Sequence, residues 1–364
     1  QGLVHLSFDD VAGSRPLPLN MPAPSGRHLI VKDDDLAVAT HGRCFWIMDN
    51  ITPLRQLQPD NQSGLAKASP SGGTSFCSSS STTQLFKPQT ALRVRWNFNT
   101  DTPLPPDEPV GENPPEGTII DYSLGEDISG PVTLEIKDAK GHLVRRYAST
   151  DPAPTPDPKL KIPRYWVKPP QCLSDKPGLH RFFWNLHDTL LPDAEPEYPM
   201  TAVLEKTAPQ PTAPWIVPGN YSIVLTAGGK RFTQPLSVKM DPRVPATTAD
   251  LAKQFELSKM LFELRAKLQP FGKNYEALVA EVLRVKKSAG ENPINEQLEA
   301  FYKKLETLAN PADVRSGHPL QLDALNKVKK LIGDLQDVDA APTPAQLGAA
   351  TNLQLDVKGV MEQW

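Results

Sequence analysis

Two histidines and four carboxylates within one stretch are the residues whose types best suit metal chemistry. The stretch HRFFWNLHDTLLPDAEPEYP contains His180 and His187, followed by four acidic residues: Asp188, Asp193, Glu195 and Glu197. The histidines are seven positions apart, so on one continuous strand they point to opposite faces and cannot share an ion without a bulge. The acidic spacing lacks the glycine and the terminal glutamate of a helix-loop-helix calcium loop. We therefore predict no metal site.

Motifs for catalysis or for cofactor binding are also missing from the sequence. There is no GxSxG, HExxH, phosphate-binding loop, GxGxxG or paired CxxC pattern. Choosing two of the 42 acidic residues as a glycosidase pair would be arbitrary, because that chemistry is defined by the separation of carboxylates in space. The sequence predicts no catalytic residue and no cofactor, and it favours a non-enzymatic role for this chain.

Composition narrows the class of protein further. The formal net charge of −3 argues against a nucleic-acid-binding surface, and no apolar stretch reaches the length of a membrane span. Proline is abundant, with 39 residues in 364, so long extended connections are expected between ordered parts. The opening QGLVHLSFDD has neither an initial Met nor a signal peptide, and we interpret the chain as a fragment.

Three cysteines allow at most one disulfide. Cys77 and Cys172 both lie in loop-like sequence and could pair, whereas Cys44 follows a turn. We expect free thiols, and the disulfide state of Cys77 and Cys172 stays open at this stage.

The first 55 residues are predicted to form a small antiparallel sheet. Four runs rich in β-formers are separated by turn residues: LVHLSF (3–8), RHLIVK (27–32), DLAVAT (35–40) and CFWIMD (44–49). Trp46 is expected in the core, and His41, next to Gly42, in a turn. A single sheet of this kind is the unit of a β-propeller blade, which needs neighbours to bury both of its faces.

Residues 56–117 are predicted to be a connector. A Ser/Gly-rich stretch and a Pro-rich stretch flank ALRVRWNF, which predicts one strand near residues 91–98. Strict alternation places the apolar residues on one face, which we expect to be buried, with the polar residues opposite: Leu92, Val94, Trp96 and Phe98 against Arg93, Arg95 and Asn97. Because the aromatic residues and the arginines lie on opposite faces, we prefer a half-buried strand to a nucleic-acid surface.

Residues 118–242 are predicted to form a β-sandwich of immunoglobulin or fibronectin type III shape. Six runs have strand character: TIIDYSL, PVTLEIKD, HLVRRYA, LHRFFWNL, NYSIVLTA and KRFTQPLSVKM. Val132, Leu134 and Ile136 alternate with polar residues and are expected to face the core. The Cys…Trp…Cys pattern of antibody domains is missing. The Pro-rich segment between HLVRRYA and LHRFFWNL is expected to be a loop over the sandwich.

Residues 243–364 change to a helical period. Thr247 and Asp250 form a capping box, and the following leucine stripe is expected to break at Pro270, with residues 274–288 continuing the helix. Further helices are expected after Pro293, Pro319 and Pro344. Each carries one apolar stripe, so we predict an antiparallel bundle, with a partner-binding coiled coil as the alternative.

Long strings of the sequence resemble one protein family. The run SFDD, LNMP and DDDLAVATHGRCFWIMDNITPLRQL, then LFKPQTALRVRWN, NTDTPLPPDEPVGENPPEGTIIDY and PGNYSIVLTAGGKRFTQPLSVKMDPRV, resembles the C-terminal region of bacterial sortilin-like β-propeller proteins. These proteins are built from bacterial neuraminidase (BNR) repeats and are often labelled glycosyl hydrolases. Two departures are the broken aspartate box SFDDVAGSRPL and the presence of Cys44 and Asn50 where the family tends to have Ser and Asp.

The resemblance implies a fold and a set of partners. It implies that residues 1–55 are the last blade of a propeller, followed by the sandwich and the bundle, in a secreted or periplasmic protein. The missing blades or a second copy would then cover the sheet, and a peptide or a glycan is a possible ligand. Sialidase-type propellers draw catalytic groups from several blades, so the label transfers no catalytic residue. We expect a non-catalytic, ligand-binding or scaffolding part, with an accessory module of a carbohydrate-active glycoside hydrolase as the alternative.

Overall fold

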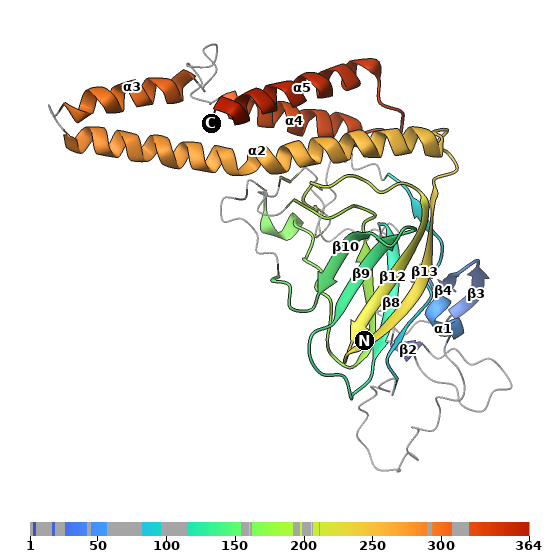
Figure 1. The fold of residues 1–364 in the computed structure, drawn as a ribbon. Helices are drawn as coiled ribbons and strands as arrows, with labels where there is room; N and C mark the ends of the chain where they lie inside the picture. Colours follow the sequence, from blue (N-terminus) through green and yellow to red (C-terminus); the bar gives the residue numbers. More distant parts are fainter. Residues whose placement is uncertain are drawn as a thin grey trace.

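The fold combines β-sheets in the first two-thirds of the chain with long helices after residue 247 (Figure 1). The structure is a computed structural model. It describes residues 3–4, 17–18, 26–41, 45–56, 82–95, 116–153, 160, 162–191, 197–198, 205, 207–210, 212–289, 293–307 and 320–363. Mixed β and α structure was expected. Within the described residues, no helix has the length and apolar character needed to cross a membrane.

An N-terminal sheet contains three antiparallel strands in the order β3 (Gly26–Lys32), β4 (Asp35–Thr40) and β5 (Phe45–Met48). The run that we expected as its fourth strand is elsewhere: β1 (Leu3–Val4) pairs with β2 (Leu17–Pro18) in a separate two-stranded sheet. The prediction of one four-stranded sheet is therefore wrong for the described residues. The segment between the first two predicted strands, which we expected to contain turn residues, includes strand β2, and β2 lies nearer to β1 along the chain than the other strands do.

The two faces of the N-terminal sheet differ in burial. Leu36 and Val38 are buried together with Ile51, and Trp46, expected in the core, packs against them. The short helix α1 (Thr52–Gln56) follows directly. Residues on the opposite face, including Phe45 and Ile47, are exposed. The sheet therefore has a covered apolar face and an open one.

Two larger sheets form what we call the β body. One has the strand order β10-β9-β12-β13-β7 and the other β11-β8-β6. The strands are β6 (Gln84–Leu85), β7 (Ala91–Arg93), β8 (Thr118–Leu124), β9 (Thr133–Asp138), β10 (Leu143–Ala148), β11 (Gly178–Trp184), β12 (Gly219–Ala227) and β13 (Lys230–Met240). All six runs that were predicted as strands in residues 118–242 form strands.

Both sheets of the β body contribute to one core. Ile120 and Trp184 come from the smaller sheet and Leu134, Ile136 and Ile223 from the larger one, and all are fully buried in the same cluster. Alternation along β9 places its apolar side chains in this core, as predicted. The Pro-rich loop between β10 and β11 includes a short 3-10 turn, η2 (Arg164–Trp166).

The prediction of which side chains of the connector strand are buried is wrong for strand β7. It pairs in parallel with β13, and Arg93 is buried to 1% exposure whereas Leu92 is 48% exposed. The predicted faces are thus reversed, because Arg93 points into a polar contact with the helices. Trp96, Asn97 and Phe98 lie outside the described residues.

Among the described residues after the β body, four helices are present: α2 (Thr248–Ala289), α3 (Ile294–Thr307), α4 (Leu320–Gln336) and α5 (Pro344–Gln363). The first half of α2 packs against α4 and α5 through a cluster that includes Leu261, Val328 and Ala350. The second half of α2 lies beside α3 (Figure 1), where Val282 and Leu305 are buried in a smaller cluster. Helix α2 therefore spans the whole length of the helical layer.

The expected break at Pro270 does not occur. Helix α2 continues through Pro270, although proline removes one backbone hydrogen bond and costs about 3 kcal/mol in a helix interior. Leu268 and Tyr275 are buried on either side of it, in contacts with α4 and α5 and with α3 respectively. Packing on both sides holds the helical path that local propensity disfavours.

The capping box at the start of α2 is confirmed. The Asp250 backbone N–H donates to Thr247 Oγ1 at 3.1 Å, and the Thr247 N–H donates to the Asp250 carboxylate at 3.2 Å. These reciprocal bonds satisfy backbone donors that the first helical turn leaves free.

We predict that Thr247→Ala lowers the free energy of unfolding by about 1 kcal/mol, because it removes a helix N-cap. Thr351→Ala is the matched control, since the exposed Thr351 hydroxyl only bonds to the Leu347 carbonyl within α5. Urea unfolding followed by circular dichroism at 222 nm measures both. Equal stability of the two variants would contradict the role of the cap.

Candidate functional site

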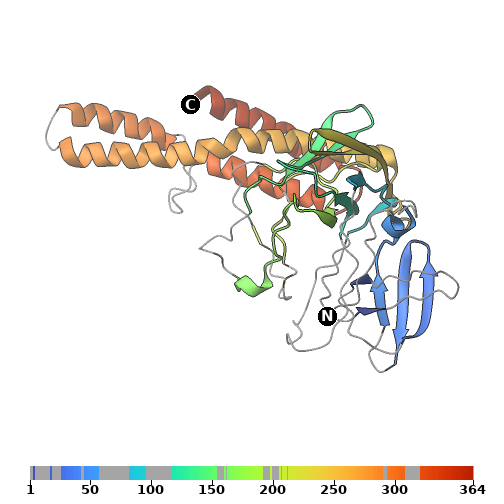
Figure 2. The same ribbon diagram turned by 90° about the horizontal axis from the view of Figure 1, so that it is seen from below.

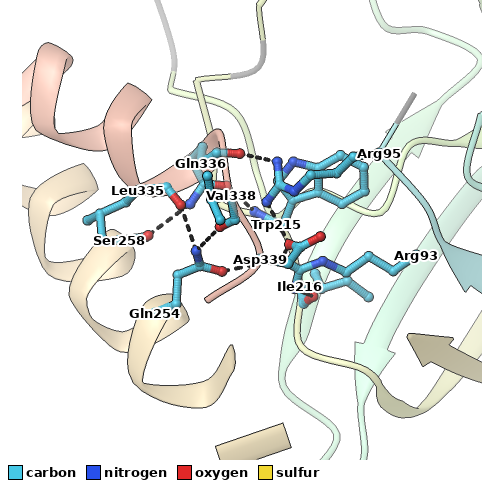
Figure 3. Close-up of polar contacts among 10 residues, drawn as sticks. All are labelled: Arg93, Arg95, Trp215, Ile216, Gln254, Ser258, Leu335, Gln336, Val338 and Asp339. Atoms are coloured by element: carbon cyan, nitrogen blue, oxygen red, sulfur yellow. Dashed lines mark hydrogen bonds and ion pairs between the residues drawn. The ribbon is translucent and has the colours of Figure 1, made fainter. Parts of the chain in front are cut away.

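The β body and the helices meet at a buried ion pair. Arg93 Nη2 on β7 lies 2.5 Å from Asp339 Oδ1 in the loop between α4 and α5, and these side chains are 1% and 4% exposed (Figure 3). Arg95 Nη2 lies 2.7 Å from the same oxygen. One carboxylate oxygen thus holds two guanidinium groups, which brings β7 and the α4–α5 loop together. We call this group the arginine junction.

Trp215 forms one wall of the arginine junction. The guanidinium carbons of Arg93 and Arg95 lie 5.4 Å and 5.1 Å from the centre of its ring, within cation–π range. The Trp215 backbone N–H donates to the Gln336 side chain at 3.0 Å. The aromatic ring shields the charges from water on one side, while its backbone connects to α4.

The C-terminal end of α4 is part of the same junction. Gln254 on α2 donates to the carbonyls of Leu335 and Val338 at 2.6 Å and 2.5 Å, and Arg95 donates to the Gln336 carbonyl. Carbonyls at a helix C-terminus carry a partial negative charge. Asp339 carries one negative charge and faces two arginines, so the carbonyls at the end of α4 help to offset the charge of the second arginine. Burial lowers the pKa of Arg93, and Asp339 opposes that shift.

A second polar contact joins the β body to α2. Lys259 Nζ lies 2.6 Å from the buried carboxylate of Asp188. The neighbouring His187 ring packs against Trp215 at a tilt of 48°, with ring centres 4.3 Å apart. Burial, with smaller contributions from the charges of Arg93, Arg95 and Arg145, lowers the pKa of His187 to about 3. His187 is therefore neutral at physiological pH and packs as an aromatic ring.

A third polar contact joins the N-terminal sheet to the β body, and we call it the aspartate junction. Arg181 on β11 donates to the Asp121 carboxylate at 2.8 Å and to the backbone carbonyls of Asp49 and Asn50 at 2.8 Å and 2.9 Å. Asn50 Nδ2 donates to Asp121 at 3.0 Å, and Asn50 adopts a left-handed conformation with φ of 59°. Burial raises the pKa of Asp121, and Arg181 lowers it in part. The turn after β5 is fixed by side chains of the β body.

The charged groups of these three contacts join different parts of the same chain. Within the described ranges, no three His, Cys, Asp or Glu side chains come together to hold a metal ion. The carboxylates of Asp339, Asp188 and Asp121 each face a cation of the same chain. A carboxylate held in such a pair is a poor general base, because proton uptake would break the pair.

The two histidines and the described acidic residues between positions 180 and 197 do not come together in one site. His180 on β11 contacts the Lys176 carbonyl and lies beside Tyr122, whereas His187 lies past the strand end against Trp215. Asp188 pairs with Lys259, and Glu197 pairs with Lys329. Asp193 and Glu195 lie outside the described residues.

The cysteines give a partial result. Cys172 is exposed and unpaired in the described structure. Cys44 and Cys77 lie outside the described residues, so the pairing of Cys77 with Cys172 stays an open question.

Sequence reasoning missed the arginine junction. Arg93 and Asp339 are 246 positions apart, so no short motif links them. The available signal was a pair of arginines in a strand of alternating pattern, which we assigned to the solvent face.

Comparisons with known proteins give no match: no family model, no curated protein and no solved structure matches this chain.

We predict that Asp339→Asn lowers the free energy of unfolding by about 3–5 kcal/mol, because it leaves the buried guanidinium of Arg93 and the half-buried one of Arg95 without a counter-charge. Arg284→Gln is the control, since it breaks the exposed Arg284–Glu281 pair, which contributes little. Chemical unfolding of the two variants at pH 7 makes the comparison. If both variants are equally stable, the arginine junction does not hold the fold.

His187 should make stability depend on pH. Its folded pKa of about 3 lies below its ordinary value of 6.5, so unfolding takes up a proton between these pH values. The contribution is complete above pH 6.5 and is lost as pH falls toward 3, by about 1.4 kcal/mol per pH unit. His187→Gln should remove this slope, and the exposed control His28→Gln should keep it. Equal slopes in unfolding experiments from pH 7 to pH 4 would contradict the assignment.

Proposed function

We propose that this chain is a non-catalytic scaffolding or ligand-binding part of a secreted or periplasmic sortilin-like β-propeller protein. In this proposal the N-terminal sheet is the last propeller blade, and the β body is a sandwich of immunoglobulin or fibronectin type III shape. The helices form an antiparallel bundle. The sequence resemblance motivates the family, and the arrangement of the described residues supports the scaffolding role.

The observation that carries the proposal is the open face of the N-terminal sheet. Leu36 and Val38 cover one face with a small core, but Ile30, Phe45 and Ile47 on the other face remain exposed. Apolar side chains on both faces are typical of a sheet that packs between two layers, as a propeller blade does. A neighbouring blade would cover the open face.

Rigid attachment of the sheet supports a scaffolding role. The aspartate junction fixes the turn after β5, and Gln56 exchanges two hydrogen bonds with the Lys87 backbone at 2.8 Å and 2.9 Å. The arginine junction in turn fixes the helices on the β body. A ring of blades attached to this sheet would therefore be held at a defined angle to the helices.

An exposed tyrosine beside a half-buried tryptophan favours the alternative function, an accessory module of a glycoside hydrolase. Tyr165 is 57% exposed and lies perpendicular to Trp166, with ring centres 6.1 Å apart. The backbone carbonyls of both residues accept bonds from Glu205 and Thr207, which fix the turn. An exposed aromatic ring such as that of Tyr165, on a fixed turn, suits stacking on a sugar ring. Saturable binding to a glycan array, lost in Tyr165→Ala, would favour this alternative.

The mass of the native protein tests the propeller proposal. We expect an intact mass well above the 40.0 kDa of this chain, with several repeats of about 40–50 residues preceding Gln1. Mass spectrometry and N-terminal sequencing of protein isolated from its source make the measurement. A native chain that begins at Gln1 and weighs 40.0 kDa would contradict the proposal.

A further inference from the structure

One buried arginine of helix α2 has no bonding partner among the described residues. Arg265 is only 7% exposed and its Nε is buried without a hydrogen bond. Its Nη groups also have no hydrogen bond or ion pair within the described part of the chain. By contrast, the buried Arg93 bonds to Asp339 and to two other groups. A buried guanidinium is costly without a counter-charge, so the isolation of Arg265 needs an explanation.

Glu197 is the acidic residue whose charge acts on Arg265, but its carboxylate is bound elsewhere. Burial lowers the pKa of Arg265, and Glu197 opposes that shift. The Glu197 carboxylate is 56% exposed and lies 2.9 Å from Nζ of Lys329 on α4, which runs beside the first half of α2 (Figure 2). The Gln210 backbone N–H holds the Glu197 carbonyl at 2.7 Å. Two cations therefore share one exposed carboxylate, and a net positive charge remains among these three side chains.

A second unpaired polar group lies one helical turn further along α2. Gln269 is four positions after Arg265, so the two side chains lie on the same face of the helix, with Cβ atoms about 5–6 Å apart. Oε1 of Gln269 is buried and has no hydrogen-bond partner in the described structure. This face of α2 thus offers guanidinium donors next to an amide acceptor. It complements a ligand that carries both an acceptor and a donor.

The buried charge selects a carboxylate as the acceptor. One water molecule can accept from Arg265 and donate to Gln269, but a neutral molecule leaves the guanidinium charge uncompensated. A carboxylate supplies the negative charge and binds a guanidinium through two parallel hydrogen bonds. Because a carboxylate has no donor, the bond to Gln269 must come from a neighbouring atom of the ligand, such as a hydroxyl. The small exposed surface of Arg265 favours a small anion over a long chain.

We infer that Arg265 and Gln269 form a binding site for a small carboxylate anion with a hydroxyl on the neighbouring carbon. The carboxylate binds the Arg265 guanidinium, and the hydroxyl donates to Gln269 Oε1. Lys329 adds positive charge, whereas Glu197 opposes binding because it has the same charge as the ligand. The inference rests on side chains of α2 and their neighbours, so it does not depend on the propeller proposal.

Glycolate and acetate are matched probes, because they differ only in the hydroxyl on the neighbouring carbon. Titration of the full chain, followed by saturation-transfer difference NMR near neutral pH and at low salt, measures both dissociation constants. The buffer contains no other carboxylate and no phosphate. We expect glycolate to bind with a dissociation constant on the order of 1 mM. Acetate should bind about fivefold more weakly, since it lacks the bond to Gln269.

Three substitutions separate the roles of the side chains. Arg265→Gln should weaken glycolate binding by at least about tenfold, without lowering the melting temperature of the free protein, because it removes an unpaired buried charge. Gln269→Leu should abolish the preference for glycolate over acetate. Glu197→Gln should strengthen the binding of both probes. Arg284→Gln is the matched control, since it changes an exposed arginine of the same helix and should leave both constants unchanged.

Four results would overturn the inference. The first is an absence of glycolate binding at concentrations up to about 50 mM. The second is an affinity that Arg265→Gln leaves unchanged or that Arg284→Gln also lowers, which would place the anion elsewhere. The third is a lower melting temperature of Arg265→Gln, which would make this arginine a structural residue. The fourth is equal affinity for glycolate and acetate, or tighter binding of inorganic phosphate or N-acetylglycine, which would contradict the ligand class.

Discussion

The ion pair between Arg93 and Asp339 is the interaction on which the arrangement of this protein depends. Arg93 belongs to a strand of only three residues, and Asp339 belongs to a loop between two helices. A buried guanidinium is costly unless a counter-charge and hydrogen-bond acceptors surround it. Asp339, the Ile216 carbonyl and Gln254 provide these partners, and they come from different parts of the chain. The charge is therefore stable only when β body and helices are assembled in this orientation.

The same physical solution recurs at the N-terminal sheet. There the buried carboxylate of Asp121 is the charge that needs partners, and Arg181 and Asn50 provide them. In both junctions a charge inside the β body selects one position for a neighbouring element. Apolar packing alone is not directional, whereas charged hydrogen bonds fix distance and angle. This combination is what the scaffolding role that we propose would require.

Local patterns in the sequence predicted much of the fold. Alternation of Val132, Leu134 and Ile136 identified a core strand, because period two and a buried face go together. Thr247 and Asp250 identified the start of α2 through the chemistry of the cap. These features depend on residues that are neighbours in the chain, so a single sequence contains the information.

Features that depend on distant residues could not be predicted. Arg93 reads as a solvent-facing residue until its partner, far away in the chain, is known. Pro270 reads as a helix end, but packing of Leu268 and Tyr275 overrides that preference. Both junctions belong to this class, so the sequence indicated the elements and left their mutual arrangement unknown.

Differential scanning calorimetry tests most directly whether the β body and the helices are one coupled unit. We expect them to unfold in one cooperative transition, with equal calorimetric and van't Hoff enthalpies. Two separate transitions, one with the loss of helical circular dichroism and one with the loss of β structure, would contradict it.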